Sequence, residues 1–370
     1  PVSMLKRPGM HLLSSMQAVA HGSNSVQYFQ FRKSRGSCEK FHGAVVDHVG
    51  NSGPYDFVRT ENTRVFKDVQ QVGAALREMN ARGDVYGTAV KPQVAIVYDV
   101  ENRWALDAAA GPRNKDKDEK YVETLLKHYR PFWDAGVQVD IVDMDGDISG
   151  YKLVVAPMLY MYRAGFEQKM RAFVENGGTL VTTYWSGIVD ESDLCRLGGV
   201  PGGMMDVFGV WNEEIDSLPD GVKNSVAVNG RSYDAFELCA RIHPITAEVL
   251  GTYEKDFYAG EPAVTKNRFG SGAAYYIAAR TGTDLLADLY GGLISALGIA
   301  RAIDTALPAG VTAHERIGEN GAVVFVENYN NAEETVELPG GYELYGTGER
   351  VNSIKLAPFG VAVLSKLTKI

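Results

Sequence analysis

The feature of the sequence that most constrains its fold is an alternation of short apolar runs with segments of helical spacing. Val94–Tyr98 is a continuous apolar run, which is typical of a strand covered on both faces. The strands predicted are 94–98, 137–142, 153–157, 179–183 and 273–277, and the helices are 120–135, 165–176 and 284–297. Strands that alternate with helices predict a parallel, doubly wound α/β sheet, flavodoxin-like in outline, extending to about residue 305.

The first 88 residues predict a helix, a strand, a long polar loop and a second helix. A helix is expected over 9–22, opened by Pro8, and an aromatic-rich strand over 26–31. After the polar stretch 32–62, a helix with one apolar face is expected from Thr63 to Gly83. This is about one and a half units of a β/α architecture, which is too little to close a core by itself.

The last segment contains only short alternating runs separated by Gly, Asn and Pro. The runs are 311–317, 322–328, 333–338, 342–344 and 361–364. They predict a small antiparallel β domain.

Composition excludes several classes of protein. The 370 residues carry a formal net charge of −9, which does not suit a nucleic-acid binder, and no run of about 18 apolar residues predicts a membrane span. Three cysteines without a CxxC pair predict neither a disulfide framework nor a zinc site built from this chain. No charged and apolar leader opens the chain, so we expect a cytoplasmic protein. The first residue is Pro, so we also expect a piece of a longer chain.

Glu39 and His42 are candidate ligand-binding residues, because they lie three residues apart in the loop after the predicted strand 26–31. A carboxylate and an imidazole in one cleft can hold two adjacent hydroxyls, and in β/α barrels such loops lie on the active-site face. The alternative is a solvated loop with an incidental Glu and His. Arg32, Lys33 and Arg35 nearby are interpreted as an exposed basic rim.

A second group of polar residues follows the predicted strand 94–98. Asp99, Glu101 and Asn102 could bind a cation or a polar partner, because ligands bind at the carboxyl ends of strands in open α/β sheets. We favour the alternative, a loop network tied to Arg103 and Trp104.

The sheet segment is similar in outline to class I glutamine amidotransferases, which place a nucleophilic Cys on a strand-to-helix elbow. The matching elbow here, 156–160, has the sequence Ala-Pro-Met-Leu-Tyr and no Cys. Nucleophilic catalysis in this domain is therefore not expected.

A series of ordered motifs adds a family resemblance that covers nearly the whole chain. The motifs are KRPGM at 6–10, QAVAHG at 17–22, YFQFR at 28–32, EKFHGA at 39–44, YDVENRWAL at 98–106, GPR at 111–113, HYRP at 128–131, SGYKLVVAP at 149–157 and SGIVDE at 186–191. Together they resemble glycoside hydrolase family 42, the β-galactosidases. The resemblance implies that residues 1–88 end a TIM (β/α)8 barrel, 90–305 form a flavodoxin-like trimerisation domain, and 308–370 form a C-terminal antiparallel β domain.

The resemblance also assigns residue roles. Family members are retaining enzymes with two catalytic glutamates ~5–5.5 Å apart, and both are implied to lie upstream of Pro1, so no catalytic residue is expected here. The cysteines that bind zinc in some members are also implied to lie upstream, so no cofactor or metal site is expected in this portion. Glu39 and His42 match the pair that binds the galactosyl hydroxyls, and Phe29 matches an aromatic residue of the cleft. Residues 51–62 are interpreted as an extra or variable insertion.

We therefore expect a portion of a retaining β-galactosidase that acts on terminal β-D-galactosides, forms a homotrimer, and binds neither nucleic acid nor membrane. The rest of the barrel would belong to the same or a separate chain. The alternative is that the chain alone is a non-catalytic oligomerisation or sugar-binding module. Against this alternative, the barrel portion alone should expose a large apolar patch made of Met10, Leu13, Met16, Val26, Tyr28 and Phe31.

Overall fold

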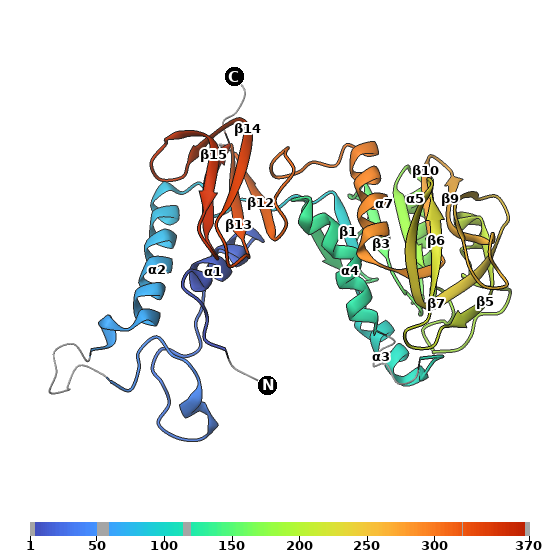
Figure 1. The fold of residues 1–370 in the computed structure, drawn as a ribbon, viewed down its shortest axis with the longest axis horizontal. Helices are drawn as coiled ribbons and strands as arrows, with labels where there is room; N and C mark the ends of the chain where they lie inside the picture. The colour runs from blue at the N-terminus through green and yellow to red at the C-terminus, as the bar shows by residue number, and fades with distance from the viewer. Residues whose placement is uncertain (1–3, 50–58, 114–119, 320, 367–370) are drawn as a thin grey trace. The chain divides into compact units, whose positions relative to one another are not determined.

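A computed structural model describes residues 4–49, 59–113, 120–319 and 321–366. The chain divides into two compact units (Figure 1). The larger unit contains Pro92–Trp133 and Val139–Ala300. The smaller unit joins the residues up to Lys91 with Asp134–Gln138 and with the residues from Arg301 onward. Residues far apart in the sequence therefore build the smaller unit together.

The larger unit contains the predicted parallel sheet. Five strands follow the order β2-β1-β3-β4-β10 with every neighbouring pair parallel. They are β1 (Val94–Val97), β2 (Val139–Val142), β3 (Leu153–Ala156), β4 (Thr179–Thr183) and β10 (Gly272–Ile277). The helices are α3 (Val100–Ala109), α4 (Tyr121–Asp134), α5 (Phe166–Glu175) and α7 (Thr283–Ala296). β1, β3 and β4 are buried along their whole length, as their apolar runs predicted. The prediction of a doubly wound α/β sheet is confirmed.

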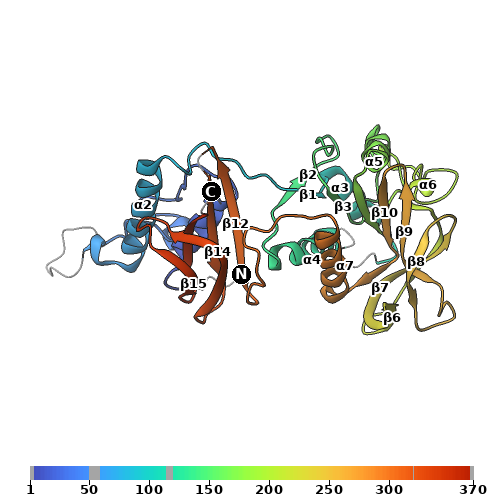
Figure 2. The same ribbon diagram turned by 90° about the horizontal axis from the view of Figure 1, so that it is seen from above.

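An antiparallel extension of this sheet was not predicted. It contains α6 (Met205–Phe208), β5 (Val210–Ser217), β6 (Lys223–Val228), β7 (Arg231–Pro244), β8 (Glu248–Tyr253), β9 (Pro262–Phe269) and β11 (Ala279–Thr281). β9 pairs antiparallel with β10, and the complete sheet has eleven strands (Figure 2). β5 combines buried positions with exposed charged ones, so it has no continuous apolar run to mark it.

The expectation of a loop after β1 is wrong, because α3 begins there. Asp99 is the N-cap of α3, and its Oδ1 accepts a hydrogen bond from the Asn102 backbone N–H at 3.0 Å. Asn102 is fully buried, and its side chain binds the Met158 carbonyl and the Met161 N–H. The polar residues after β1 therefore cap a helix and fix the loop after β3.

The smaller unit contains a five-stranded antiparallel sheet, as predicted. Its order is β12-β13-β16-β14-β15. The strands are β12 (Val311–Gly318), β13 (Gly321–Asn328), β14 (Glu334–Leu344), β15 (Arg350–Leu356) and β16 (Val361–Lys366). β14 joins two of the predicted runs across a register shift, and β15 was not predicted.

Two helices of the N-terminal segment pack against this sheet. They are α1 (Met10–Ala20) and α2 (Arg64–Arg82). Thr63 caps α2 at its start, and Gly83 ends it with a φ of 68°, as the sequence predicted. The predicted exposed apolar patch is wrong for Leu13 and Met16, which are buried. Met16 belongs to a core shared with Val323 and Phe325 of β13, because the C-terminal sheet covers α1.

A buried arginine fastens the C-terminal sheet to the N-terminal segment. Arg316 of β12 is 1% exposed, and its guanidinium donates five hydrogen bonds of 2.8–3.0 Å. The acceptors are the carbonyls of Val19, Ser23 and Thr88 and the side chains of Asn24 and Thr88. All of these acceptors are neutral. One side chain therefore holds together three separate parts of the chain.

Candidate functional site

The segment between α1 and α2 holds the residues that the sequence analysis selected. It lies as a loop beside α2 (Figure 1). The prediction of a strand over 26–31 is wrong. The segment makes a single parallel bridge between Arg32 and Val46, with Lys33 N–H bound to the Val46 carbonyl at 3.0 Å. A strand needs neighbours, and within the described ranges this segment lies beside no named strand.

Glu39 and His42 lie on one turn of this loop. Cys38–Phe41 forms a 3-10 turn (η1), and the His42 N–H donates to the Glu39 carbonyl at 3.0 Å, which closes the turn. His42 follows η1 as its C-cap residue with an extended backbone, and the side chains of Glu39 and His42 are both exposed. Glu39 Oε2 lies 3.3 Å from Ser34 Oγ, which can donate to it. One backbone hydrogen bond thus joins the two predicted residues, and their role in binding stays a prediction.

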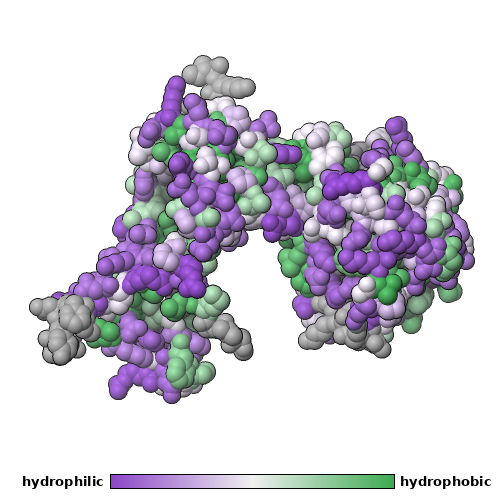
Figure 3. Space-filling model, in the orientation of Figure 1, coloured by the Kyte–Doolittle hydropathy of each residue, from purple (hydrophilic) through white to green (hydrophobic). Residues whose placement is uncertain are grey.

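Phe29, the third predicted residue, is 76% exposed. Phe31 and Phe41 of the same segment are exposed as well, and Lys40 Nζ lies 5.1 Å from the centre of the Phe41 ring. Figure 3 shows hydrophobic and hydrophilic residues mixed on this part of the surface. Exposed aromatic rings on a segment that also carries a carboxylate and an imidazole are a combination that suits a polyhydroxylated ligand with an apolar face.

Side-chain contacts of the helices α1 and α2 support this segment, and the sequence did not predict them. The Tyr28 and Ser15 hydroxyls lie 2.8 Å apart, next to Phe29 in the chain. His11 Nδ1 of α1 lies 3.2 Å from Asp68 Oδ2 of α2. Pairs between different elements leave no spacing signal in a sequence, so only the fold reveals them.

Of the predicted insertion at 51–62, residues 51–58 lie outside the described residues. Thr60–Asn62 forms a second 3-10 turn (η2) before α2. Within the predicted basic rim, Lys33 Nζ lies 3.4 Å from Asp47 Oδ2.

The carboxyl edge of the parallel sheet was the other candidate site, and its carboxylates are paired. Arg163 lies 3.1 Å from Asp99, 3.1 Å from Glu101 and 2.9 Å from Asp145. The single guanidinium offsets one of the three negative charges and lies within ion-pair distance of all three carboxylates, which ties them into one network. The structure therefore shows a polar network here, with Arg163 as its centre, whereas the expected tie to Arg103 and Trp104 stays a prediction.

The turn after β3, at residues 156–160, was compared above with the nucleophile elbow of class I glutamine amidotransferases. Its backbone is strained, but it carries no nucleophilic cysteine. Met158 has a φ of 48° and is fully buried. Arg280 fills the space beside it, with Nη2 3.2 Å from Met158 Sδ and Nη1 2.7 Å from Glu237 Oε2. Burial acts to raise the pKa of Glu237, but Lys120 and Arg280 outweigh it and hold that pKa at about 2. The space beside this elbow is therefore filled by Arg280, which binds Glu237.

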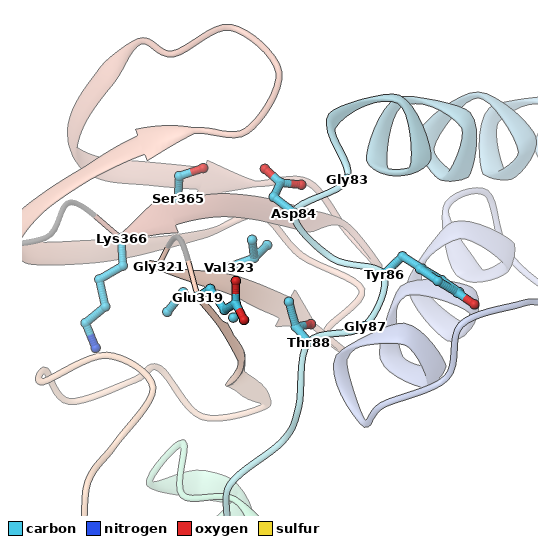
Figure 4. A pocket seen from close by; sticks show the side chains of 12 residues that line it. Gly83, Asp84, Tyr86, Gly87, Thr88, Glu319, Gly321, Val323, Ser365 and Lys366 are labelled. Atoms are coloured by element: carbon cyan, nitrogen blue, oxygen red, sulfur yellow. The ribbon is translucent and has the colours of Figure 1, made fainter.

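A cavity of about 270 Å³ lies in the smaller unit, where the turn after α2 meets β13 and β16 (Figure 4). Asp84, Glu319 and Lys366 supply charges to its lining, and the Tyr345 hydroxyl donates to Asp84. Its lining residues include none of Phe29, Glu39 and His42. The cavity is therefore separate from the predicted site.

The described ranges contain no group of three or more His, Cys, Asp or Glu residues arranged to hold a metal ion. Cys38 and Cys195 are exposed, whereas Cys239 is buried, and burial raises its pKa to about 12. The cysteines thus provide no metal site among these residues. No helix in the described part of the chain has the length and apolar character needed to span a membrane.

Three family models match consecutive parts of the chain. A model described as "Beta-galactosidase" matches residues 1–79, "Beta-galactosidase trimerisation domain" matches 92–300, and "Beta-galactosidase C-terminal domain" matches 310–366.

Curated relatives and solved structures agree with these models. β-Galactosidase Pbg of Clostridium perfringens is 51% identical over 99% of this chain and 52% of its own length. β-Galactosidase BglY of Alicyclobacillus acidocaldarius is 47% identical over 99% of this chain and 52% of its own length. The GH42 β-galactosidase Gan42B of G. stearothermophilus gives a TM-score of 0.93 at 43% identity, covering 99% of this chain and 52% of that one. The β-galactosidase of Rahnella sp. R3 gives 0.91 at 48% identity, with the same coverage.

The doubly wound sheet, the small antiparallel sheet and the three matches define the class of protein, a multidomain glycoside hydrolase. The chain belongs to glycoside hydrolase family 42, the β-galactosidases. It spans about half the length of the curated relatives it matches.

Proposed function

We propose that the full-length protein containing this chain is a retaining β-galactosidase that hydrolyses terminal, non-reducing β-D-galactosides. The observation that carries the proposal is the unbroken series of three β-galactosidase family models along the chain. The two carboxyl groups that a retaining mechanism needs ~5–5.5 Å apart belong, in this proposal, to the barrel upstream of Pro1, which residues 1–88 complete. The proposal includes a homotrimer, supported by the description of the model that matches 92–300, and a cytoplasmic location.

Within this chain we propose that Glu39, His42 and Phe29 bind the galactosyl unit. The Glu39 carboxylate accepts a hydrogen bond from one sugar hydroxyl, and the His42 imidazole donates to or accepts from the adjacent one. Phe29 lies against the apolar face of the ring. The shared turn supports this assignment, because one backbone hydrogen bond keeps the two residues close along the chain.

These contacts contribute to catalysis by orientation. Hydrogen bonds to the sugar hydroxyls hold the anomeric carbon in place, so that the attacking and protonating carboxyl groups meet it in a reactive geometry. A bond to a charged acceptor contributes about 1.5–3 kcal/mol. Glu39→Gln in the full-length enzyme should therefore lower kcat/KM for a nitrophenyl β-D-galactoside by roughly ten- to a hundredfold.

Lys40→Gln is the matched control, because Lys40 lies on the same exposed turn outside the proposed pair. It should leave kcat/KM within about twofold. If Glu39→Gln and His42→Asn both keep full activity, these residues do not bind the sugar. If the unmodified enzyme does not cleave β-galactosides, the proposed activity itself is wrong.

A further inference from the structure

The loop after β4 forms a hairpin that neither the predicted site nor the sheet core uses. Val189 makes an antiparallel bridge with Cys195 and a parallel bridge with Met161, and the Arg196 N–H binds the Ile188 carbonyl at 2.9 Å. We call residues 188–197 the 188–197 hairpin.

Hydrogen bonds fix the backbone of this hairpin. Asp190 Oδ1 accepts from the N–H groups of Ser192 at 2.9 Å and Leu194 at 3.2 Å, and the Asp190 N–H binds the Leu194 carbonyl. At the base, Arg196 binds Glu167 Oε2 at 2.7 Å and the Tyr162 carbonyl at 3.2 Å. The tip therefore has little freedom to turn its side chains inward.

Despite this rigidity, the hairpin directs large apolar side chains outward. Leu197 is 98% exposed and Leu194 is 64% exposed, and Cys195 between them is exposed too. Glu191 and Asp193 are exposed beside them. Exposed apolar side chains together with charged ones on one rigid hairpin have the composition of a protein–protein contact.

We propose that the 188–197 hairpin is a subunit contact of the homotrimer and that a second copy of this chain covers it. The inference rests on the trimer in the proposed function, and the hairpin lies inside the residues that match the trimerisation-domain model. A side chain exposed at 98% belongs to a protrusion, which contacts another surface and does not enclose a small ligand. A three-fold ring uses two different patches on each copy, so the hairpin contacts a surface unlike itself on the next copy.

The test is the mass in solution of the full-length protein with Leu194→Asp and Leu197→Asp together. Sedimentation should show the mass falling about threefold, to that of one chain, with an unchanged circular dichroism spectrum. Leu126→Asp is the matched control, because Leu126 of α4 is an equally large, 61% exposed side chain away from the hairpin. It should leave the trimer intact. A double variant that remains trimeric, or a control that dissociates in its place, overturns the proposal.

Cys195 provides a second readout that needs no variant. In the unmodified protein its alkylation, mapped by mass spectrometry, should be at least about tenfold slower at concentrations where the trimer forms than after dilution to single chains. Equal rates overturn the proposal and leave the trimer itself standing. An unmodified protein that sediments as a single chain at all concentrations overturns the trimer as well.

Discussion

Arg316 is the side chain whose removal we expect to separate the smaller unit into its parts. Arg316→Met keeps the length of the side chain and removes all five hydrogen bonds, which leaves the carbonyls of Val19, Ser23 and Thr88 without this donor inside the protein. Each buried acceptor left without a partner costs about 1–3 kcal/mol. The better solvation of methionine in an apolar site offsets part of this cost. We expect a net loss of about 3–5 kcal/mol in the stability of this unit.

Hydrogen exchange measured by mass spectrometry is the suitable assay, because the four tryptophans of this chain all lie in the larger unit and would not report on this change. Amides of α1 and β12 should exchange roughly a hundred- to several-thousandfold faster in Arg316→Met, whereas amides of β3 and β4 should not change. Arg350→Met on the same sheet is the control, since the Arg350 side chain is 80% exposed. It should change exchange by less than about twofold.

Arg316→Lys separates the charge from the geometry. An ammonium keeps the positive charge but has three donors, so at least two of the five bonds are lost and the effect should be intermediate. If Arg316→Met exchanges like the unmodified protein in α1 and β12, then these five bonds do not hold the unit together and the reasoning is refuted.

Three further predictions concern the larger unit. Burial, with a smaller effect from Lys127, lowers the pKa of His128 to about 3. The unfolded chain therefore binds a proton near pH 6.5 that the folded chain does not bind. The free energy of unfolding should fall as the pH drops below about 6.5, by at most about 1.4 kcal/mol per pH unit. Calorimetry from about pH 7 to 4 should show this slope, and His128→Gln should flatten it. Asp99→Ala should lower the free energy of unfolding in urea by about 2–3 kcal/mol, because it removes the α3 cap and one bond to Arg163. Asp99→Asn keeps an acceptor for the cap and should lower it by about 1 kcal/mol. Cys239 should resist alkylation in the native protein and react only after denaturant is added, since it is buried and its pKa is about 12.

The parallel sheet was predictable because its strands are buried on both faces and appear as unbroken apolar runs. The expected and observed bounds of β4 coincide at Thr179–Thr183. The caps Thr63 and Gly83 marked both ends of α2, since each residue type satisfies backbone groups that a helix end leaves open. In these places the local sequence alone was sufficient to predict the structure.

The remaining elements depend on contacts between distant residues. The alternating pattern at 26–31 is that of a strand, yet pairing decides whether a strand forms. Met16 was expected at the surface because the pattern of α1 does not reveal that β13 covers it. For the candidate site, the sequence placed Glu39 and His42 three residues apart in a loop, whereas the bond between Tyr28 and Ser15 of α1 required the fold.

The division of the chain has a consequence for its synthesis. The larger unit is inserted between the two halves of the smaller one, and its ends meet, since the Ala300 N–H binds Gln93 Oε1 at 2.8 Å. At about 5–20 residues per second, α1 leaves the ribosome roughly 15–60 s before its partner strands β12 and β13. The inserted unit can fold during that interval. The apolar face of α1 stays exposed until a partner nearly 300 residues away has been synthesised. We therefore expect α1 to need protection by a chaperone during translation.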